Sequence, residues 1–308
     1  MSTTQRSAVR YVLITPARNE EDYIELTIKS MVAQTHRPER WVIVSDGSTD
    51  RTDEIVKRYA AQHDWIELLR MPERKERHFG GKVTCFKAGL ERAKDVSYDV
   101  LGNLDADMSF ESDLFEFLMN KFASNPKLGV AGAPFNEGKG TYDFRFSSVE
   151  HVSGACQLFR KECWDAIGGY TPLKGGGIDV VAVLTARMKG WQTRTFPEKS
   201  LMHHRPMGTA LHGGFNVRFK LGQKDYTMGR SFLWQTFRSA YQMTRPPYFF
   251  GGFALWRGYV WSALKRIERP VSRELVEFQR REQMQRLKGF FLRKKTVAAS
   301  PEHATQTL

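Results

Sequence analysis

Short apolar runs alternate along the chain with longer segments in which apolar residues recur at helical spacing. In the first helical segment, Ile24, Ile28, Met31 and Val32 fall on one face. Four early runs are short and apolar enough for buried strands: residues 9–15, 41–45, 65–69 and 98–104. Such an alternation predicts an α/β fold, with a mostly parallel sheet and helices on both faces.

Polar segments follow these expected strands at the positions where sheets of this kind bind ligands. The segments are residues 16–20, 46–50, 80–82 and 105–107. Because the carboxyl ends of parallel strands meet at one edge of a sheet, we expect the segments to converge there. Taken singly, each acidic residue could belong to a turn or cap a helix. Three acidic segments in succession favour a binding site.

The sequence Asp105-Ala106-Asp107 places two carboxylates one residue apart, between an expected strand and the helical segment 111–124. Such a pair can hold a divalent cation and, through the cation, a diphosphate. Asp is also common in solvated turns, which is the alternative interpretation of these two residues.

Lys82 and Asp179 stand at the starts of two expected helices. Lys82 opens the segment 82–93 after two glycines, where backbone amides and the helix dipole favour a phosphate group. An exposed lysine without a ligand is the alternative. Asp179 follows a glycine-rich approach and precedes the helical segment 180–189, whose dipole would keep the carboxylate ionised. The alternative is that Asp179 is only an N-cap or an acidic residue that compensates the helix dipole.

Several spaced motifs occur together over roughly residues 9–205, about two thirds of the chain. They are Pro16-x-x-Asn19-Glu20, Ser45-Asp-Gly-Ser-Thr-Asp50, Gly81-Lys82, Asp105-Ala-Asp107, Gly154-Ala-Cys-Gln-Leu-Phe-Arg-Lys161, Ile167-Gly-Gly-Tyr170, and Gly177-Ile-Asp179 with Arg187 and Gly190. In this combination the chain resembles the family-2 glycosyltransferases, which have the GT-A fold, and in particular the bacterial enzymes of surface and exopolysaccharide synthesis.

The resemblance implies a nucleotide-sugar site at the predicted sheet edge. Its residues would be Pro16, Arg18, Glu20, Asp46, Lys82 and Asp105. Asp46 would accept a hydrogen bond from the base, usually uracil in this family. Asp105 would face the ribose and the metal, and Asp107 would bind the metal, Mg²⁺ or Mn²⁺, that bridges the diphosphate.

The resemblance also implies roles for residues in the second half of the chain. Asp179 occupies the position of the general base, although Ile178 stands where the family usually has Glu. His203 matches a histidine that completes the metal site in several members, and neutral imidazole suits Mn²⁺ better than Mg²⁺. His204 would point the opposite way in an extended segment. With Arg205 it could contact an acceptor phosphate, or it could be a satisfied core residue.

Composition adds constraints on partners and compartment. The net charge of +13 suggests an anionic partner, such as nucleic acid, a phosphorylated substrate or anionic lipid. The three cysteines, Cys85, Cys156 and Cys163, form no CxxC motif, which fits a reducing compartment. The first apolar run is stopped at once by Pro16 and charged residues, so we do not interpret it as a secretory signal.

The composition changes in the C-terminal part of the chain. Residues 248–264 are nearly all apolar or aromatic, with Arg257 as the only charged residue, but the run is too short for a confident transmembrane span. Residues 272–295 have helical spacing, and residues 257–295 contain 12 Lys and Arg against four Glu, a net of +8. This combination favours attachment to an anionic membrane surface. The alternative is a helix packed on the protein with a solvated basic face.

These observations predict a GT-A catalytic domain over residues 1–225, a helical, apolar and basic region over 226–298 and a disordered tail over 299–308. We expect a metal-dependent, inverting glycosyltransferase that uses a nucleotide-diphosphate sugar, with UDP as the expected nucleotide. Its acceptor would be a membrane-held, lipid-linked saccharide, and the protein would be peripheral on the cytoplasmic face of the cell membrane. Two alternatives are a basic nucleic-acid-binding protein, against which the concentration of charge in the tail argues, and an inactive nucleotide-sugar-binding protein.

Overall fold

The computed structural model describes residues 9–73, 80–137, 148–173, 175–205 and 214–298. The chain divides into two compact units, residues 1–210 and 211–308. The predicted domain boundary at residue 225 falls inside helix α7 (Gly214–Thr227), which belongs to the second unit.

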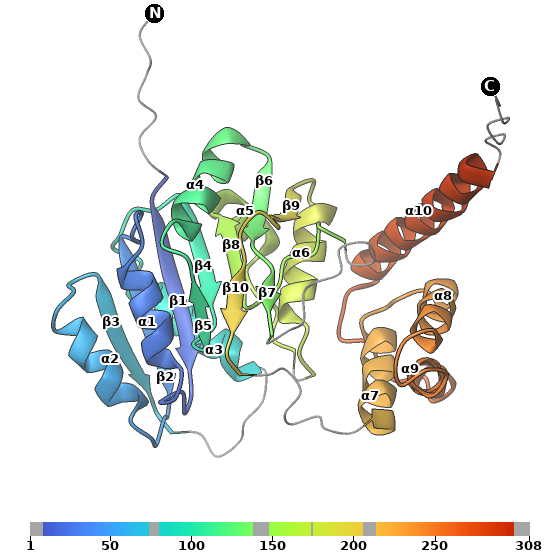
Figure 1. The fold of residues 1–308 in the computed structure, drawn as a ribbon, viewed down its shortest axis with the longest axis horizontal. Coiled ribbons are helices and arrows are strands. Elements are labelled where there is room, and N and C mark those ends of the chain that lie inside the picture. The colour runs from blue at the N-terminus through green and yellow to red at the C-terminus, as the bar shows by residue number, and fades with distance from the viewer. Residues whose placement is uncertain (1–8, 74–79, 138–147, 174, 206–213, 299–308) are drawn as a thin grey trace, which may run out of the picture. The chain divides into compact units, whose positions relative to one another are not determined.

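Seven strands form the central sheet in the described part of the first unit, in the order β3-β2-β1-β4-β8-β6-β9 (Figure 1). Their bounds are β1 (Tyr11–Ala17), β2 (Arg40–Asp46), β3 (Ile66–Met71), β4 (Val100–Leu104), β6 (Leu128–Gly132), β8 (Cys156–Arg160) and β9 (Gln192–Thr195). Neighbouring strands pair in parallel except where β8 meets β4 and β6. The predicted α/β fold with a mostly parallel sheet is confirmed.

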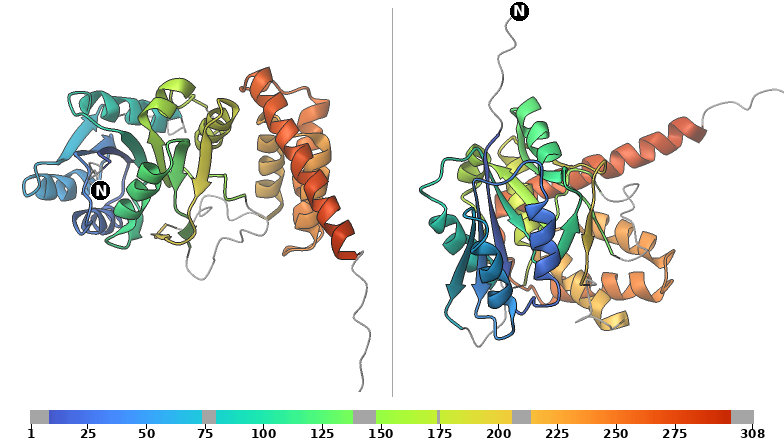
Figure 2. Two further views of the ribbon diagram at one scale, coloured as in Figure 1. Left: turned by 90° about the horizontal axis from the view of Figure 1, so that it is seen from above. Right: turned by 60° about the vertical axis from the view of Figure 1, so that its left-hand side comes forward.

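Helices cover both faces of this sheet, as Figure 2 shows. They are α1 (Ile24–Val32), α2 (Thr52–Ala60), α3 (Gly80–Arg92), α4 (Leu114–Ser124), α5 (Lys161–Ile167) and α6 (Ile178–Met188). Successive side chains of β1 point to opposite faces of the sheet, and both faces are covered. The ring of Tyr11 stacks on Phe115 of α4 with centroids 5.2 Å apart. Ile14 faces Gly89 of α3, where an added Cβ would lie 2.6 Å from its Cγ2. Both faces of the strand are therefore buried, as in other parallel sheets.

A second, three-stranded sheet lies beside the end of β4. It consists of β5 (Met108–Phe110), β10 (Leu201–His203) and β7 (Phe135–Asn136), in the order β5-β10-β7. β10 is antiparallel to β5, and His203 pairs with Met108. This register brings a residue from near the end of the first unit next to the residue that follows Asp107.

The described part of the second unit is helical. It contains α7, α8 (Phe232–Met243), α9 (Phe250–Leu264) and α10 (Arg273–Ala298). The backbones of α7 and α9 approach closely at two glycines: an added Cβ would lie 2.0 Å from the Leu255 carbonyl oxygen at Gly222, and 2.0 Å from that of Phe219 at Gly258. No described helix is both long and apolar enough to cross a bilayer.

Candidate active site

The loops after β1 and β2 are joined by hydrogen bonds at the carboxyl edge of the sheet. The Asn19 amide donates to Ser48 Oγ at 3.2 Å, and the Glu20 amide donates to Thr52 Oγ1 at 2.8 Å. These contacts place the loop after β1 beside the loop after β2. Pro16, expected in the turn, lies within β1, and Asp46 is the last residue of β2, because each strand continues beyond its apolar run. Arg18 Nη1 lies 3.9 Å from Asp46 Oδ2, and both side chains are mostly buried.

Asp105 is held by two donors from neighbouring elements. Lys82 Nζ, from the first turn of α3, lies 2.5 Å from Asp105 Oδ1, and Asn103 Nδ2 donates to the same oxygen at 3.2 Å. Burial raises the pKa of the Asp105 carboxyl, and the Lys82 ammonium opposes this shift. Lys82, predicted to meet phosphate, therefore contacts the first carboxylate of the Asp105-Ala-Asp107 motif.

The backbone of Gly154 connects this carboxylate to Asp179. Its carbonyl oxygen accepts hydrogen bonds from Asn103 Nδ2 at 2.5 Å and Lys82 Nζ at 3.4 Å, and its amide donates to Asp179 Oδ2 at 3.3 Å. A Cβ at this position would lie 3.0 Å from the Cβ of Asp179, which is why the close approach suits glycine. The structure thus brings Asp179, Lys82 and Asp105 to one place.

Asp179 lies in the first turn of α6, and Gly177 with φ of 93° is the N-cap residue. The interpretation of Asp179 as the N-cap is therefore wrong. The other part of that alternative, an acidic residue that compensates the helix dipole, fits its place in the first turn. Its backbone carbonyl is 3.4 Å from Gln157 Nε2, and Gln157 Oε1 accepts a hydrogen bond from the buried Tyr170 hydroxyl at 2.7 Å. Burial, followed by the charges of Asp179 and Asp105, raises the pKa of Tyr170 well above its usual value, so Tyr170 stays a neutral donor.

Asp107 meets His203 across the small sheet. Asp107 Oδ2 lies 3.2 Å from His203 Nε2, and Glu137 Oε1 lies 2.9 Å from His203 Nδ1. Burial alone would lower the pKa of His203, but hydrogen bonds to the two carboxylates outweigh it and raise the pKa to about 9. The imidazole is thus fixed by Glu137 on one side and faces Asp107 with the other nitrogen.

Asp107 and His203 together could hold a metal ion. A histidine that binds a metal usually donates its second ring N–H to a carboxylate, and Glu137 is placed to accept it. Asp107 and His203 then offer one oxygen and one nitrogen, a donor set that suits Mn²⁺. Within the described residues, no three His, Cys, Asp or Glu side chains gather as a complete metal site. Phosphate oxygens of a substrate and water would complete such a coordination shell.

Arg205 and His204 directly follow His203 in the chain and have separate partners. Arg205 Nη2 is 2.5 Å from Glu20 Oε2, and Arg205 Nε is 3.9 Å from Asp107 Oδ2. His204 Nε2 is 2.8 Å from Ser109 Oγ. The rings of His204 and Tyr23 stack with centroids 6.2 Å apart. The two adjacent histidines therefore have different partners, and Arg205 joins the residues after β10 to the loop after β1.

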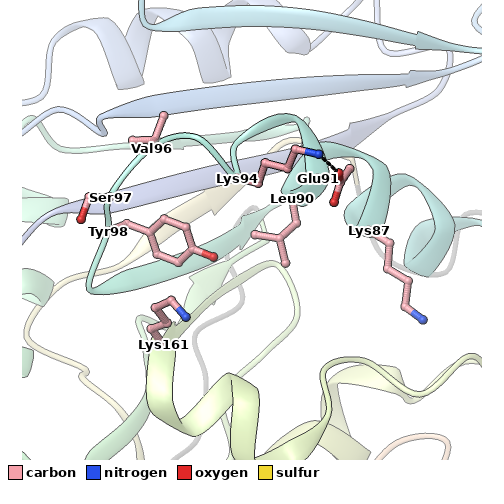
Figure 3. Close-up of a pocket in the computed structure, with 8 residues that line it drawn as sticks. All are labelled: Lys87, Leu90, Glu91, Lys94, Val96, Ser97, Tyr98 and Lys161. Atoms are coloured by element: carbon pink, nitrogen blue, oxygen red, sulfur yellow. Dashed lines mark hydrogen bonds and ion pairs between the residues drawn. The ribbon is translucent and has the colours of Figure 1, made fainter.

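A separate hollow of about 500 Å³ lies near the start of β4, at the other end of that strand from Asp105. Lys87, Lys94 and Lys161 surround Leu90 and Tyr98 in it (Figure 3). Lys94 pairs with Glu91, and Lys161 Nζ lies 3.0 Å from Asp165 Oδ2, so two of its three cations are compensated locally. The predicted site residues do not line this hollow.

A sequence model of glycosyl transferase family 2 matches residues 12–176, more than half of the chain. This chain belongs to glycosyl transferase family 2. The matched segment contains the loops after β1 and β2, Lys82, and both Asp105 and Asp107. It ends before Asp179 and His203, so their placement beside the matched residues comes from the structure.

The family-2 chain is similar to curated relatives over part of their length. A poly-beta-1,6-N-acetyl-D-glucosamine synthase from Staphylococcus aureus (strain MSSA476) is 29% identical over 136 residues, which cover 44% of this chain and 31% of the synthase. The synthase of the same name from Staphylococcus epidermidis is 28% identical over 140 residues, with the same shares. The matches thus span about a third of these relatives.

Solved structures share the fold of this family-2 chain at low sequence identity. Mannosyltransferase PcManGT from Pyrobaculum calidifontis, in complex with GDP-Man and Mn²⁺, has a TM-score of 0.55 and 20% identity, and the match covers 93% of this chain and 81% of that one. Residues 1–349 of S. aureus TarS, in complex with UDP-GlcNAc, have a TM-score of 0.53 and 12% identity, with 88% and 78% covered. These likenesses support the α/β architecture.

Glu137 is the residue of this cluster that sequence reasoning missed. It follows β7 in the segment after β6, and neither strand was predicted. Glu137 directly follows β7, which belongs to the small sheet, so the rule for the ends of the parallel strands does not apply to it. Recognising residues 128–132 as a buried strand could have drawn attention to it.

Proposed function

We propose that this protein is a metal-dependent, inverting glycosyltransferase that takes a sugar from a UDP-linked donor and transfers it to a membrane-held saccharide. The observation that carries the proposal is the convergence of two groups at one sheet edge. One group is the Asp107 and His203 pair, and the other is Asp179, joined through Gly154 to Asp105 and Lys82. Residues suited to donor binding, to metal binding and to proton removal all lie at this edge.

The nucleotide side is assigned to the loops after β1 and β2. We propose that Pro16, Arg18, Glu20, Asp46, Lys82 and Asp105 line the donor site. The Asp46 carboxylate can accept the imide N–H of uracil, a hydrogen bond that the base pairing edge of uracil offers. Arg18, 3.9 Å from Asp46, orients that carboxylate. Lys82 is the cation that moves between Asp105 and the donor phosphates.

The metal side is assigned to Asp107 and His203, with Asp105 close by. When bound, Mn²⁺ or Mg²⁺ neutralises charge that develops on the leaving diphosphate. Glu137 holds the His203 ring with Nε2 directed toward Asp107. Arg205, 3.9 Å from Asp107, and His204 are proposed to contact phosphate or acceptor groups.

Asp179 is assigned the role of general base. The Gly154 amide donates a hydrogen bond to Asp179 Oδ2 and holds the carboxylate in the first turn of α6, where we propose that it accepts a proton. The acceptor hydroxyl gives its proton to Asp179 while its oxygen attacks the anomeric carbon. The bond to the diphosphate oxygen breaks on the opposite face of the sugar, which inverts the anomeric configuration.

The acceptor is proposed from the relatives and from the second unit. The similar staphylococcal proteins are polysaccharide synthases by name, which supports a growing saccharide as the acceptor class. The apolar and basic residues of the second unit support a lipid-linked acceptor at the cytoplasmic face of the cell membrane.

Equilibrium binding of nucleotides tests the donor assignment. UDP, GDP and ADP are titrated into the protein with Mn²⁺ and with a chelator. The proposal expects UDP to bind most tightly and to lose affinity when the metal is removed. Equal binding of all three nucleotides, or affinity unaffected by the chelator, would contradict it.

A further inference from the structure

The outward face of α9 carries four large apolar residues, with the exposed Arg257 between them. Phe250, Phe253, Trp261 and Leu264 recur with the spacing of one helical face, and all four are exposed, Phe250 by 70% and Leu264 by 79%. The opposite face, which includes Gly252, Leu255 and Tyr259, is buried against other helices of the second unit. A helix that is apolar on both faces is normally covered on both.

Exposed aromatic rings extend this face into the turn between α8 and α9. Tyr248 and Phe249 are 66% and 57% exposed. The ring of Phe249 stacks on Phe253 with centroids 5.7 Å apart, so turn and helix form one continuous surface. We call this surface, made by residues 248–250, 253, 261 and 264, the α9 apolar stripe.

Basic residues precede, interrupt and follow the stripe along the sequence. Residues 226–267 contain six Lys and Arg and no Asp or Glu. Arg230 and Arg238 pair with Asp225, while Arg245 precedes the stripe and Lys265 and Arg266 follow it. Arg257 lies on the same face of α9, between Phe253 and Trp261, and its guanidinium is over the Phe219 ring at 5.7 Å.

We propose that the α9 apolar stripe lies in the plane of an anionic lipid surface. A helix of 15 residues spans about 22 Å, too short to cross the roughly 30 Å hydrocarbon layer but long enough to lie along its boundary. Exposed Phe, Tyr and Trp rings suit the interface, and basic residues at both ends of the helix suit lipid phosphates.

Charge favours lipid over a second copy of the chain as the occupant. In a two-fold dimer the same face would meet itself, so the basic ends of the stripe would come close to like charges. Anionic headgroups neutralise those charges instead. The inference rests on the proposed function in one respect, the membrane-held acceptor, and it adds which surface of the protein enters the lipid.

A fluorescent label at position 253 tests the proposal on the full chain. The three native cysteines are all buried, so Phe253→Cys offers one accessible thiol for an environment-sensitive dye such as NBD. Lys57→Cys, on an exposed position of α2, is the matched control. With vesicles containing phosphatidylglycerol, we expect the emission at 253 to rise several-fold and shift to the blue, and the emission at 57 to stay unchanged.

A paired substitution tests the same surface without a label. Phe250→Ser with Phe253→Ser removes two exposed rings, and Leu26→Ser removes an exposed apolar side chain of α1 as the control. The double variant should lose most vesicle binding that survives high salt, because this part depends on apolar burial. The control should bind as the parent does.

The outcomes separate this inference from the proposed function. If the protein binds vesicles but the dye at 253 does not respond, or if the double variant binds as the parent does, the α9 apolar stripe is not the lipid-contacting surface. Membrane attachment itself would stand. A blue-shifted emission at 253 without lipid would also overturn the proposal. If this emission depends on protein concentration, a second copy of the chain covers the stripe, and if it does not, the first unit covers it. Absence of vesicle binding would remove both membrane claims, and donor binding by the same sample would still report on the catalytic site.

Discussion

Asp179 Oδ2 accepts a hydrogen bond from the Gly154 amide at 3.3 Å, and the carbonyl of the same glycine accepts one from Lys82. One peptide segment therefore fixes the proposed base relative to the cation that holds Asp105. This link joins α6, which carries Asp179, to α3, which carries Lys82. Substitutions of Asp179 and of Lys82, which Gly154 links, should accordingly affect turnover and donor binding to different extents.

The clearest substitution on the base side is Asp179→Asn. The amide has nearly the same volume and can still accept the Gly154 hydrogen bond, but it cannot take a proton. We expect turnover to fall by on the order of 10² to 10⁴ with donor affinity preserved. Steady-state rates and donor titrations on the same preparation check this, and near-normal turnover would move the base to another residue.

Gly154→Ala tests the positioning of Asp179. The added Cβ would lie 3.0 Å from the Cβ of Asp179 and 3.4 Å from its Oδ2, so the carboxylate has to shift. We expect turnover to fall by about tenfold or more, since a misplaced base is costly. Gly175→Ala is the control, because a Cβ there meets no atom of the described residues within 4 Å. Equal rates for the two variants would show that the Gly154 contact does not position the base.

Asp107→Asn tests the metal side. It removes charge at nearly constant volume and leaves His203 facing a weak ligand. We expect the Mn²⁺-dependent part of donor affinity to fall by about tenfold or more while the thermal unfolding midpoint changes little. Calorimetric titration of UDP with and without Mn²⁺ measures the effect. Asp64→Asn, which changes an exposed acidic residue of the same unit, is the control. If Asp107→Asn binds UDP in Mn²⁺ as tightly as this control does, Asp107 is not a metal ligand.

The basic face of α10 should add a salt-sensitive part to membrane binding. Arg281 and Lys288 are exposed on this helix, whereas Arg280 Nε donates to the Gly229 carbonyl at 3.1 Å and is left intact. We expect Arg281→Glu with Lys288→Glu to weaken binding to anionic vesicles in low salt, with little change in high salt. Sedimentation with vesicles checks this, with Lys57→Glu as the control. Parent-like binding in low salt would place these residues away from lipid.

The sequence predicts the parallel half of the sheet well, because β1, β2 and β4 are buried on both faces and show as continuous apolar runs. Because the carboxyl ends of parallel strands lie at one edge of the sheet, the sequence also predicts that the polar residues at the ends of β2 and β4 lie at the same edge. Asp46, Asp105 and Asp107 can therefore be identified as site candidates without knowledge of any long-range contact.

Other parts of the site depend on contacts that no local pattern contains. β8 runs antiparallel between β4 and β6, and β7 and β10 have only two and three residues. Such short strands carry too few residues to show a period. The pairing of His203 with Met108, the contact of Glu137 with His203 and the bridging role of Gly154 all follow from these strands, so they became visible only in the folded chain.

Metal-dependent cleavage of a nucleotide sugar is the most direct test of the central claim. Release of the nucleoside diphosphate is measured over a panel of nucleotide sugars, with Mn²⁺ and with a chelator, for the parent protein and Asp107→Asn. The account predicts release from a UDP-sugar that requires Mn²⁺ and is lost in the variant. Release that is equally fast with the chelator, or equally fast in Asp107→Asn, would contradict it.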